Sequence, residues 1–241
     1  MNRTIARLAA QSLFGQKRWW VLVSLPLLLI VLCALVQFLT SGDAAATSFE
    51  PVIVVFGLGL VLPLVALLVT TGVLGPEIDD GSIVYLLSKP ISRFVVAVSK
   101  LAVAVAVTVL LGAGSLLVAG LILDPSEPGQ AIAVGVGSAV AGTAYCSAFV
   151  MLSAINRHGM VSGLLYVLVF EGLLASWLSG LRYVSVSAFG RRIAEGMDES
   201  LNLIAGNLPL GYAWIASLVV TVAGCYVAGL RLARFQLRGD E

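Results

Sequence analysis

One acidic side chain, Glu171, lies within an otherwise uncharged apolar stretch that covers residues 160–179. A carboxylate at the centre of a membrane helix costs at least about 2.5 kcal/mol on insertion scales, so such a residue is usually functional or bound to a partner. The carboxylate could line a polar path through the protein, or it could form a hydrogen bond that locks two helices together. Glu171 is therefore the first candidate for a functional side chain.

The other reactive residue types form no recognised catalytic set. The segment 159–163 reads GMVSG, which superficially resembles a serine-protease motif. A Ser–His pair would need a histidine facing Ser162 at membrane depth, whereas His158 lies on a connecting turn at the edge of the apolar run. The sequence contains no P-loop for ATP, no H-E-x-x-H and no acid–histidine cluster for a metal. It therefore predicts no catalytic residue and no metal ligand.

The composition determines which scaffold carries these residues. The chain has 241 residues, of which 59% are hydrophobic and 11% are charged, against roughly 25% charged residues in an average soluble domain. So few charges cannot cover the surface of a soluble fold of this length. The composition excludes a cytosolic enzyme, a disordered chain and a nucleic-acid-binding protein, and it predicts a polytopic membrane protein. The three cysteines lie in apolar runs and predict neither a disulfide framework nor a metal site.

Six apolar runs are long enough to cross a bilayer as helices, because a span needs roughly 20 residues. They cover residues 20–39, 52–74, 101–123, 131–155, 160–179 and 208–230. The fourth run is rich in Gly, Ala and Ser, which predicts a helix that packs closely against others. We predict an all-α protein whose 241 residues form a single transmembrane domain without a nucleotide-binding domain.

The basic residues predict the orientation of these spans. With six spans, eleven of the fourteen Lys and Arg residues fall on the side that carries both termini. Because short loops rich in Lys and Arg stay in the cytoplasm, both termini are predicted to be cytoplasmic. The long outer segment 180–209 mixes apolar and charged residues, which predicts one or two short helices on the outer leaflet.

Two further segments are predicted to lie on the cytoplasmic side. Residues 2–18 place apolar and basic side chains on different helix faces, which is typical of an interfacial helix; it is either a hinge that enters the membrane sideways or a simple topology anchor. The loop 75–100 carries acidic residues first, apolar residues next and basic residues last, which favours a short helix. The apolar face of that helix could rest on the membrane helices or in a groove of a partner.

The loop resembles the permease subunits of ABC type-2 exporters. The family pattern is matched at Glu77, Gly81-Ser82, Leu86-Leu87, Pro90-Ile91-Ser92-Arg93 and Lys100. Members with an aromatic-Glu-Gly step in the fifth span are matched by Phe170-Glu171-Gly172, and the stretch 181–193 (LRYVSVSAFGRRI) resembles the segment that follows that step.

The resemblance implies a transporter made of two kinds of subunit in the plasma membrane of a bacterium or archaeon. Two permease subunits, here expected to be identical, would form the path, and two separate ATPase subunits would hold ATP and Mg²⁺. This chain itself would carry no cofactor. The residues expected to form the coupling helix that contacts the ATPase are Glu77, Asp79, Asp80, Ile83, Leu86, Leu87, Pro90 and Arg93.

The resemblance also bears on the substrate and on Glu171. By analogy with the family, Glu171 would lie near the path. A path with one acid and otherwise apolar or hydroxyl side chains favours export of a hydrophobic or amphipathic substrate, such as a drug, an antibiotic or a lipid. Two alternatives remain open, namely a secondary transporter driven by protons through Glu171, and a membrane scaffold or maturation factor of the same architecture.

Overall fold

The computed structural model describes residues 18–40, 48–79, 93–156, 158–174, 179–203, 205 and 208–234. Helices account for nearly all of this part of the chain, and no strand occurs in it. The predicted interfacial helix 2–18 lies outside the described residues, except for Arg18 at the start of the first helix.

Five helical stretches are long and apolar enough to cross a membrane. The first is α2 (Arg18–Leu39), and the second runs through α4 (Phe49–Pro51), η1 (Val52–Val61) and α5 (Leu62–Asp79). The third comprises α7 (Arg93–Thr108), η2 (Val109–Ala113) and α8 (Gly114–Leu123). The remaining two are α9 (Pro128–Ile155) and α13 (Leu210–Arg234). The prediction of an all-α polytopic membrane protein is confirmed.

The predicted span 160–179 is shorter in the structure. It comprises α10 (Gly159–Leu165) and the π-helical segment η3 (Tyr166–Leu174), with an apolar helix from Gly159 to Leu173. Residues 175–178 lie outside the described part. The predicted short outer helices are present as η4 (Ser179–Tyr183) and α12 (Val186–Met197).

The third span begins earlier than predicted. Its helix starts at Arg93, eight residues before the predicted edge at Leu101, because Phe94–Val98 are apolar and continue the helix. Lys100, which the sequence places in a cytoplasmic loop, is instead a helical residue with a side chain only 1% exposed.

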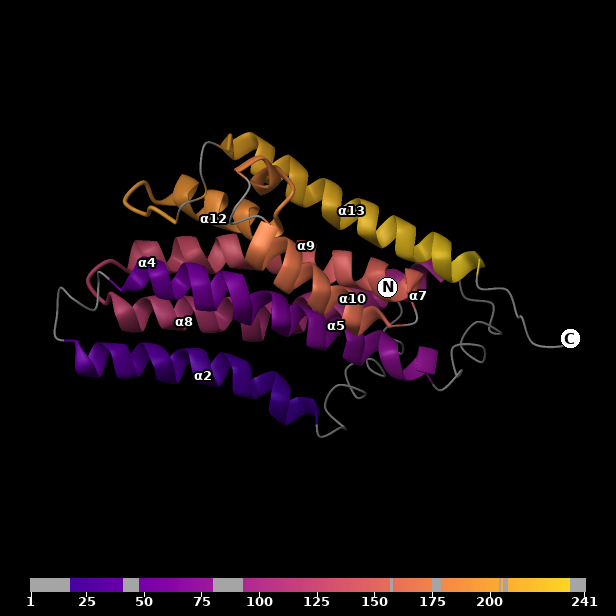
Figure 1. The fold of residues 1–241 in the computed structure, drawn as a ribbon, viewed down its shortest axis with the longest axis horizontal. Coiled ribbons are helices and arrows are strands. Elements are labelled where there is room, and N and C mark those ends of the chain that lie inside the picture. Colours follow the sequence, from indigo (N-terminus) through magenta and orange to yellow (C-terminus); the bar gives the residue numbers. More distant parts are fainter. Residues whose placement is uncertain are drawn as a thin grey trace, which may run out of the picture.

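The centre of the bundle is α9, which contacts α5, α7, α8, α12 and α13. In Figure 1, α2 lies along one side of the bundle and α13 along the other, with α9 between them. Small residues allow this close packing: a Cβ on Gly137 would lie 2.3 Å from the Gly190 carbonyl oxygen, and one on Gly224 would lie 2.6 Å from Ser147 Oγ. The predicted packing role of the fourth run is therefore confirmed within the subunit.

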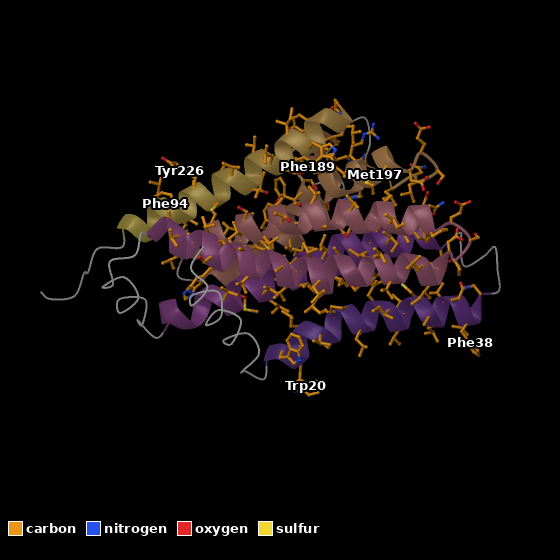
Figure 2. The ribbon with its side chains drawn as sticks, turned by 180° about the vertical axis from the view of Figure 1, so that it is seen from behind. Trp20, Phe38, Phe94, Phe189, Met197 and Tyr226 are labelled. Atoms are coloured by element: carbon orange, nitrogen blue, oxygen red, sulfur yellow. The ribbon has the colours of Figure 1, made fainter. Side chains whose placement is uncertain are left out.

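Apolar side chains also cover the outside of the bundle. Trp20 and Phe38 on α2 are 76% and 87% exposed, and both point away from the other helices in Figure 2. Further exposed apolar residues follow α13, including Ile215 and Leu218. A soluble protein rarely exposes such continuous apolar surface, whereas lipid tails solvate it.

Candidate functional site

Glu171 is the sixth residue of η3, a π-helical segment whose turns are wider than those of an α-helix. Short π-helical segments re-aim side chains and occur frequently at functional sites. The Glu171 side chain is 7% exposed, so its carboxylate faces the protein interior.

The carboxylate of Glu171 binds the N-terminus of α12. Its Oε1 accepts a 2.8 Å hydrogen bond from the backbone N–H of Val186, and the N–H of Ser187 lies 3.4 Å from both carboxylate oxygens. Ser185 Oγ donates to Oε2 at 3.0 Å, and the Tyr166 hydroxyl donates to Oε1 at 3.2 Å. Because the first N–H groups of a helix have no partner within the helix, a carboxylate placed there satisfies them and complements the helix dipole.

Ser185 completes this cap from within the outer segment. It precedes α12 in an extended conformation, and its Oγ accepts the N–H of Ala188, as an N-cap serine does. The same oxygen lies 3.1 Å from Ser187 Oγ. The start of α12 is thus held by two oxygen acceptors, one from Ser185 and one from a residue fourteen positions earlier in the chain.

A partly buried cation, Arg191, lies next to the cap. Arg191 Nη2 donates to Ser187 Oγ at 2.8 Å, so Ser187 connects the guanidinium to the group of atoms around Glu171. Burial lowers the pKa of Arg191, and the nearby Glu171 carboxylate partly offsets this effect. A guanidinium stays protonated at physiological pH despite such a shift. Glu171 is therefore connected to a basic group through Ser187.

Aromatic side chains cover the other side of the carboxylate. Tyr145 on α9 is fully buried and lies close to Glu171. Its ring stacks on Phe149 with centroids 5.7 Å apart, and Phe149 meets Tyr166 edge-on at 6.3 Å. These rings exclude water from the carboxylate, which strengthens its hydrogen bonds.

The geometry thus places Glu171 in a bond that joins η3 to α12. This is the arrangement expected if the acid locks two helices together. The assignment of Glu171 to a substrate path stays a prediction.

The predicted coupling residues lie only partly within the described structure. Glu77 and Asp79 belong to the last part of α5, and Arg93 is the first residue of α7. The other five lie outside the described residues: Asp80, Ile83, Leu86, Leu87 and Pro90. Because α5 and α7 contact each other, both ends of the segment 80–92 are joined to neighbouring helices.

Sequence reasoning missed the residues that surround Glu171, including its partner Tyr166, five positions before it. Ser185, Ser187 and Arg191 lie fourteen to twenty residues beyond it, across a connection whose path the sequence does not reveal. The signal that could have located them is a serine at the start of an amphipathic stretch, which marks the N-terminus of a helix. Among the described residues, no group of three or more His, Cys, Asp or Glu side chains could hold a metal ion.

The bundle of apolar helices defines a polytopic α-helical membrane protein. Residues 3–181 of the 241 match the family described as ABC-2 family transporter protein, and the chain belongs to that family. It is therefore a membrane subunit of an ABC transporter rather than an ATP-hydrolysing chain. The match includes Glu171 and the segment 80–92, and it ends before α12. The comparison with curated proteins found no match.

Proposed function

We propose that this chain is the permease subunit of an ABC exporter that moves a hydrophobic or amphipathic substrate outward. Two copies form the path, and two copies of a separate ATPase bind ATP and Mg²⁺ and drive the cycle. The observation that carries the proposal is the family match over residues 3–181, together with a bundle of apolar helices. We place the complex in the plasma membrane of a bacterium or archaeon, with both termini in the cytoplasm.

The surroundings of Glu171 support an apolar or amphipathic substrate. The acid in the fifth span already accepts bonds from Val186 and Ser185. Binding a cation or a sugar there would compete with those bonds. The same observation favours ATP over protons as the energy source, because a proton-carrying carboxylate has to exchange with water during each cycle.

The segment 80–92 is the proposed contact with the ATPase. It connects α5 to α7, so a push on this segment reaches two helices of the bundle directly. Glu77, Asp79 and Arg93 would flank the contact, and Leu87 would supply its apolar face. A short helix with an apolar face and charged ends fits a groove on a soluble partner.

Reconstitution tests the proposal. The tagged chain is purified from its native membrane, and a stoichiometric partner with a P-loop is identified and reconstituted with it in vesicles. We expect ATP-dependent efflux of an amphipathic dye that vanadate stops and a protonophore does not. Efflux that follows a proton gradient without the ATPase would contradict the proposal and favour a secondary transporter.

Substitutions in the segment separate its role from general stability. Leu87→Ala should weaken ATPase binding and lower transport per ATP hydrolysed. Leu121→Ala is a matched control, because Leu121 is a partly exposed leucine near the far end of α8. If Leu87→Ala and Glu77→Ala bind the ATPase and transport as the wild type does, the coupling assignment is wrong.

A further inference from the structure

Lys100 is a charged side chain inside the bundle that the proposed function leaves unexplained. It lies on α7, is 1% exposed, and is among the largest fully buried side chains of the described structure. Its Nζ donates a 3.1 Å hydrogen bond to the backbone carbonyl of Val73 on α5. The bond joins residues 27 positions apart.

A buried ammonium is costly unless its surroundings compensate the lost hydration. The neighbouring helix turns are unusually polar: Thr70 and Thr71 on α5 and Ser99 on α7 are all buried. The two threonine hydroxyls donate to carbonyls one turn earlier in α5. Loss of the bond to Val73 would leave the buried ammonium without this acceptor, so the position of Lys100 depends on α5.

The bond lies at the base of the proposed coupling segment. Val73 is six residues before the end of α5 at Asp79, and Lys100 is seven residues after the start of α7 at Arg93. At about 1.5 Å per residue these are depths of about 9 and 11 Å. The bond therefore ties α5 and α7 together at nearly equal depths beneath both ends of the segment 80–92.

The start of α7 is also held from the other side. A Cβ on Gly229 of α13 would lie 2.5 Å from the Phe94 ring, so this ring packs directly against the backbone of α13. The rings of Phe94 and Tyr226 lie with centroids 6.0 Å apart, side by side at the end of the bundle in Figure 2. The first turns of α7 are thus fixed between α5, through Lys100, and α13, through Phe94.

We propose that Lys100 is a positioning residue that clamps α5 to α7, so that a force applied to the segment 80–92 moves both helices as one unit. The inference rests on the proposed function, because it needs an ATPase that acts on that segment. Without the clamp, the two helices could separate at their bases and absorb the displacement locally. ATP hydrolysis would then continue with less transport.

The test compares Lys100→Met with the wild type in the reconstituted complex with its ATPase. Methionine keeps an unbranched side chain but removes the ammonium. The control is Thr108→Val, which removes the bond from Cys146 Sγ to Thr108 Oγ1 on the same helix but away from the segment. Assembly with the ATPase, ATP hydrolysis and efflux are measured on equal amounts of assembled complex.

We expect Lys100→Met to bind the ATPase with unchanged affinity and to transport about fivefold less per ATP, the lower end of typical coupling between distant sites. Thr108→Val should couple as the wild type does. A general loss of stability would lower the amount of complex without changing the ratio of transport to hydrolysis. Lys100→Met complexes with the wild-type ratio would overturn the clamp.

A second measurement needs no substitution at Lys100. Spin labels at Leu68 on α5 and Val98 on α7, both partly exposed, report the separation of the two helices. With ATPase bound, this distance should change by less than about 2 Å between the ATP-free and ATP-bound states, the scale of small helix shifts. A larger change in a transporting complex would overturn the proposal. If instead no ATPase binds the wild-type chain, it is the proposed function that fails.

Discussion

Removal of the Glu171 carboxylate should strongly destabilise the contact between η3 and the start of α12. The carboxylate accepts a 2.8 Å bond from the Val186 N–H and a 3.0 Å bond from Ser185 Oγ. A hydrogen bond to a charged group contributes about 1.5–3 kcal/mol net, and a buried donor left unsatisfied costs about 1–3 kcal/mol. Some relaxation will recover part of this loss. We expect Glu171→Ala to lower the free energy of unfolding by about 3–5 kcal/mol, the upper range for a single substitution.

Glu171→Gln should have a smaller effect, because glutamine keeps the shape of the side chain and one acceptor oxygen. That oxygen can still accept the Val186 N–H. The amide group cannot accept the second N–H, and the negative charge at the helix N-terminus is lost. A charge in this position contributes about 0.3–1 kcal/mol, and up to about 2 kcal/mol when partly buried. We expect a loss of about 1–2 kcal/mol for this variant.

Reversible unfolding in mixed micelles measures these differences. The control is Glu50→Gln, since Glu50 Oε1 accepts the N–H of Asn202 at 2.9 Å at a solvent-exposed position. An exposed bond of this kind should contribute less than about 1 kcal/mol. The same purified variants, reconstituted with the ATPase in vesicles, report transport, because Glu171→Gln should assemble and stay folded.

Two results would refute this reasoning. Glu171→Ala with the unfolding free energy of the wild type would show that the carboxylate does not stabilise the start of α12. A Glu171→Gln permease that transports as well as the wild type would remove Glu171 from the substrate path and leave it only the structural role. Altered transport in a Gln variant of normal stability would instead assign it a role in the path.

Further predictions concern the cap and the helix contacts. Ser185→Ala should lower the free energy of unfolding by about 1–2 kcal/mol, because it removes the N-cap acceptor of Ala188 and the donor to Glu171. The double variant with Glu171→Gln should lose less stability than the sum of the two single losses, since the groups share one network. Gly224→Ala should cost about 1–3 kcal/mol, because its Cβ would lie 2.7 Å from the Ser147 carbonyl oxygen. Gly211→Ala, with nothing within 4 Å, is the matched control in the same helix. Wild-type unfolding of Gly224→Ala would contradict the α9–α13 packing.

Five of the six predicted spans correspond to helices long and apolar enough to cross a membrane, because lipid imposes a simple rule on such helices. A helix that crosses the bilayer needs about 20 apolar residues, so charge-free runs mark the spans. The predicted ends of the spans were less accurate, and Lys100 shows why. A lysine is expected outside the apolar core, yet Lys100 is buried and donates a hydrogen bond to a backbone carbonyl of another helix. Whether such a partner exists depends on tertiary packing, which no local pattern encodes.

Of the residues at the candidate site, the sequence predicted only Glu171. Glu171 was conspicuous because an acid in an apolar run is rare. Its partners are the hydroxyls of Tyr166 and Ser185 and two backbone N–H groups, which become recognisable only when α12 is placed against η3. The segment 180–209 was correctly expected to form short helices, because it mixes apolar and charged residues.

The two buried charged groups, Glu171 and Lys100, have a different role in the fold from the apolar contacts between helices. Apolar contacts between helices are not specific in lipid, because the tails are as apolar as the side chains. Small residues on α9 permit close approach in the middle of the bundle, at Gly137 and near Gly224. Polar bonds then determine which helices pair. The Glu171 carboxylate binds the start of α12, and the Lys100 ammonium binds α5. Because these bonds lie in separate networks, their losses should be additive, and Glu171→Gln should leave hydrogen exchange at the α5–α7 contact unchanged.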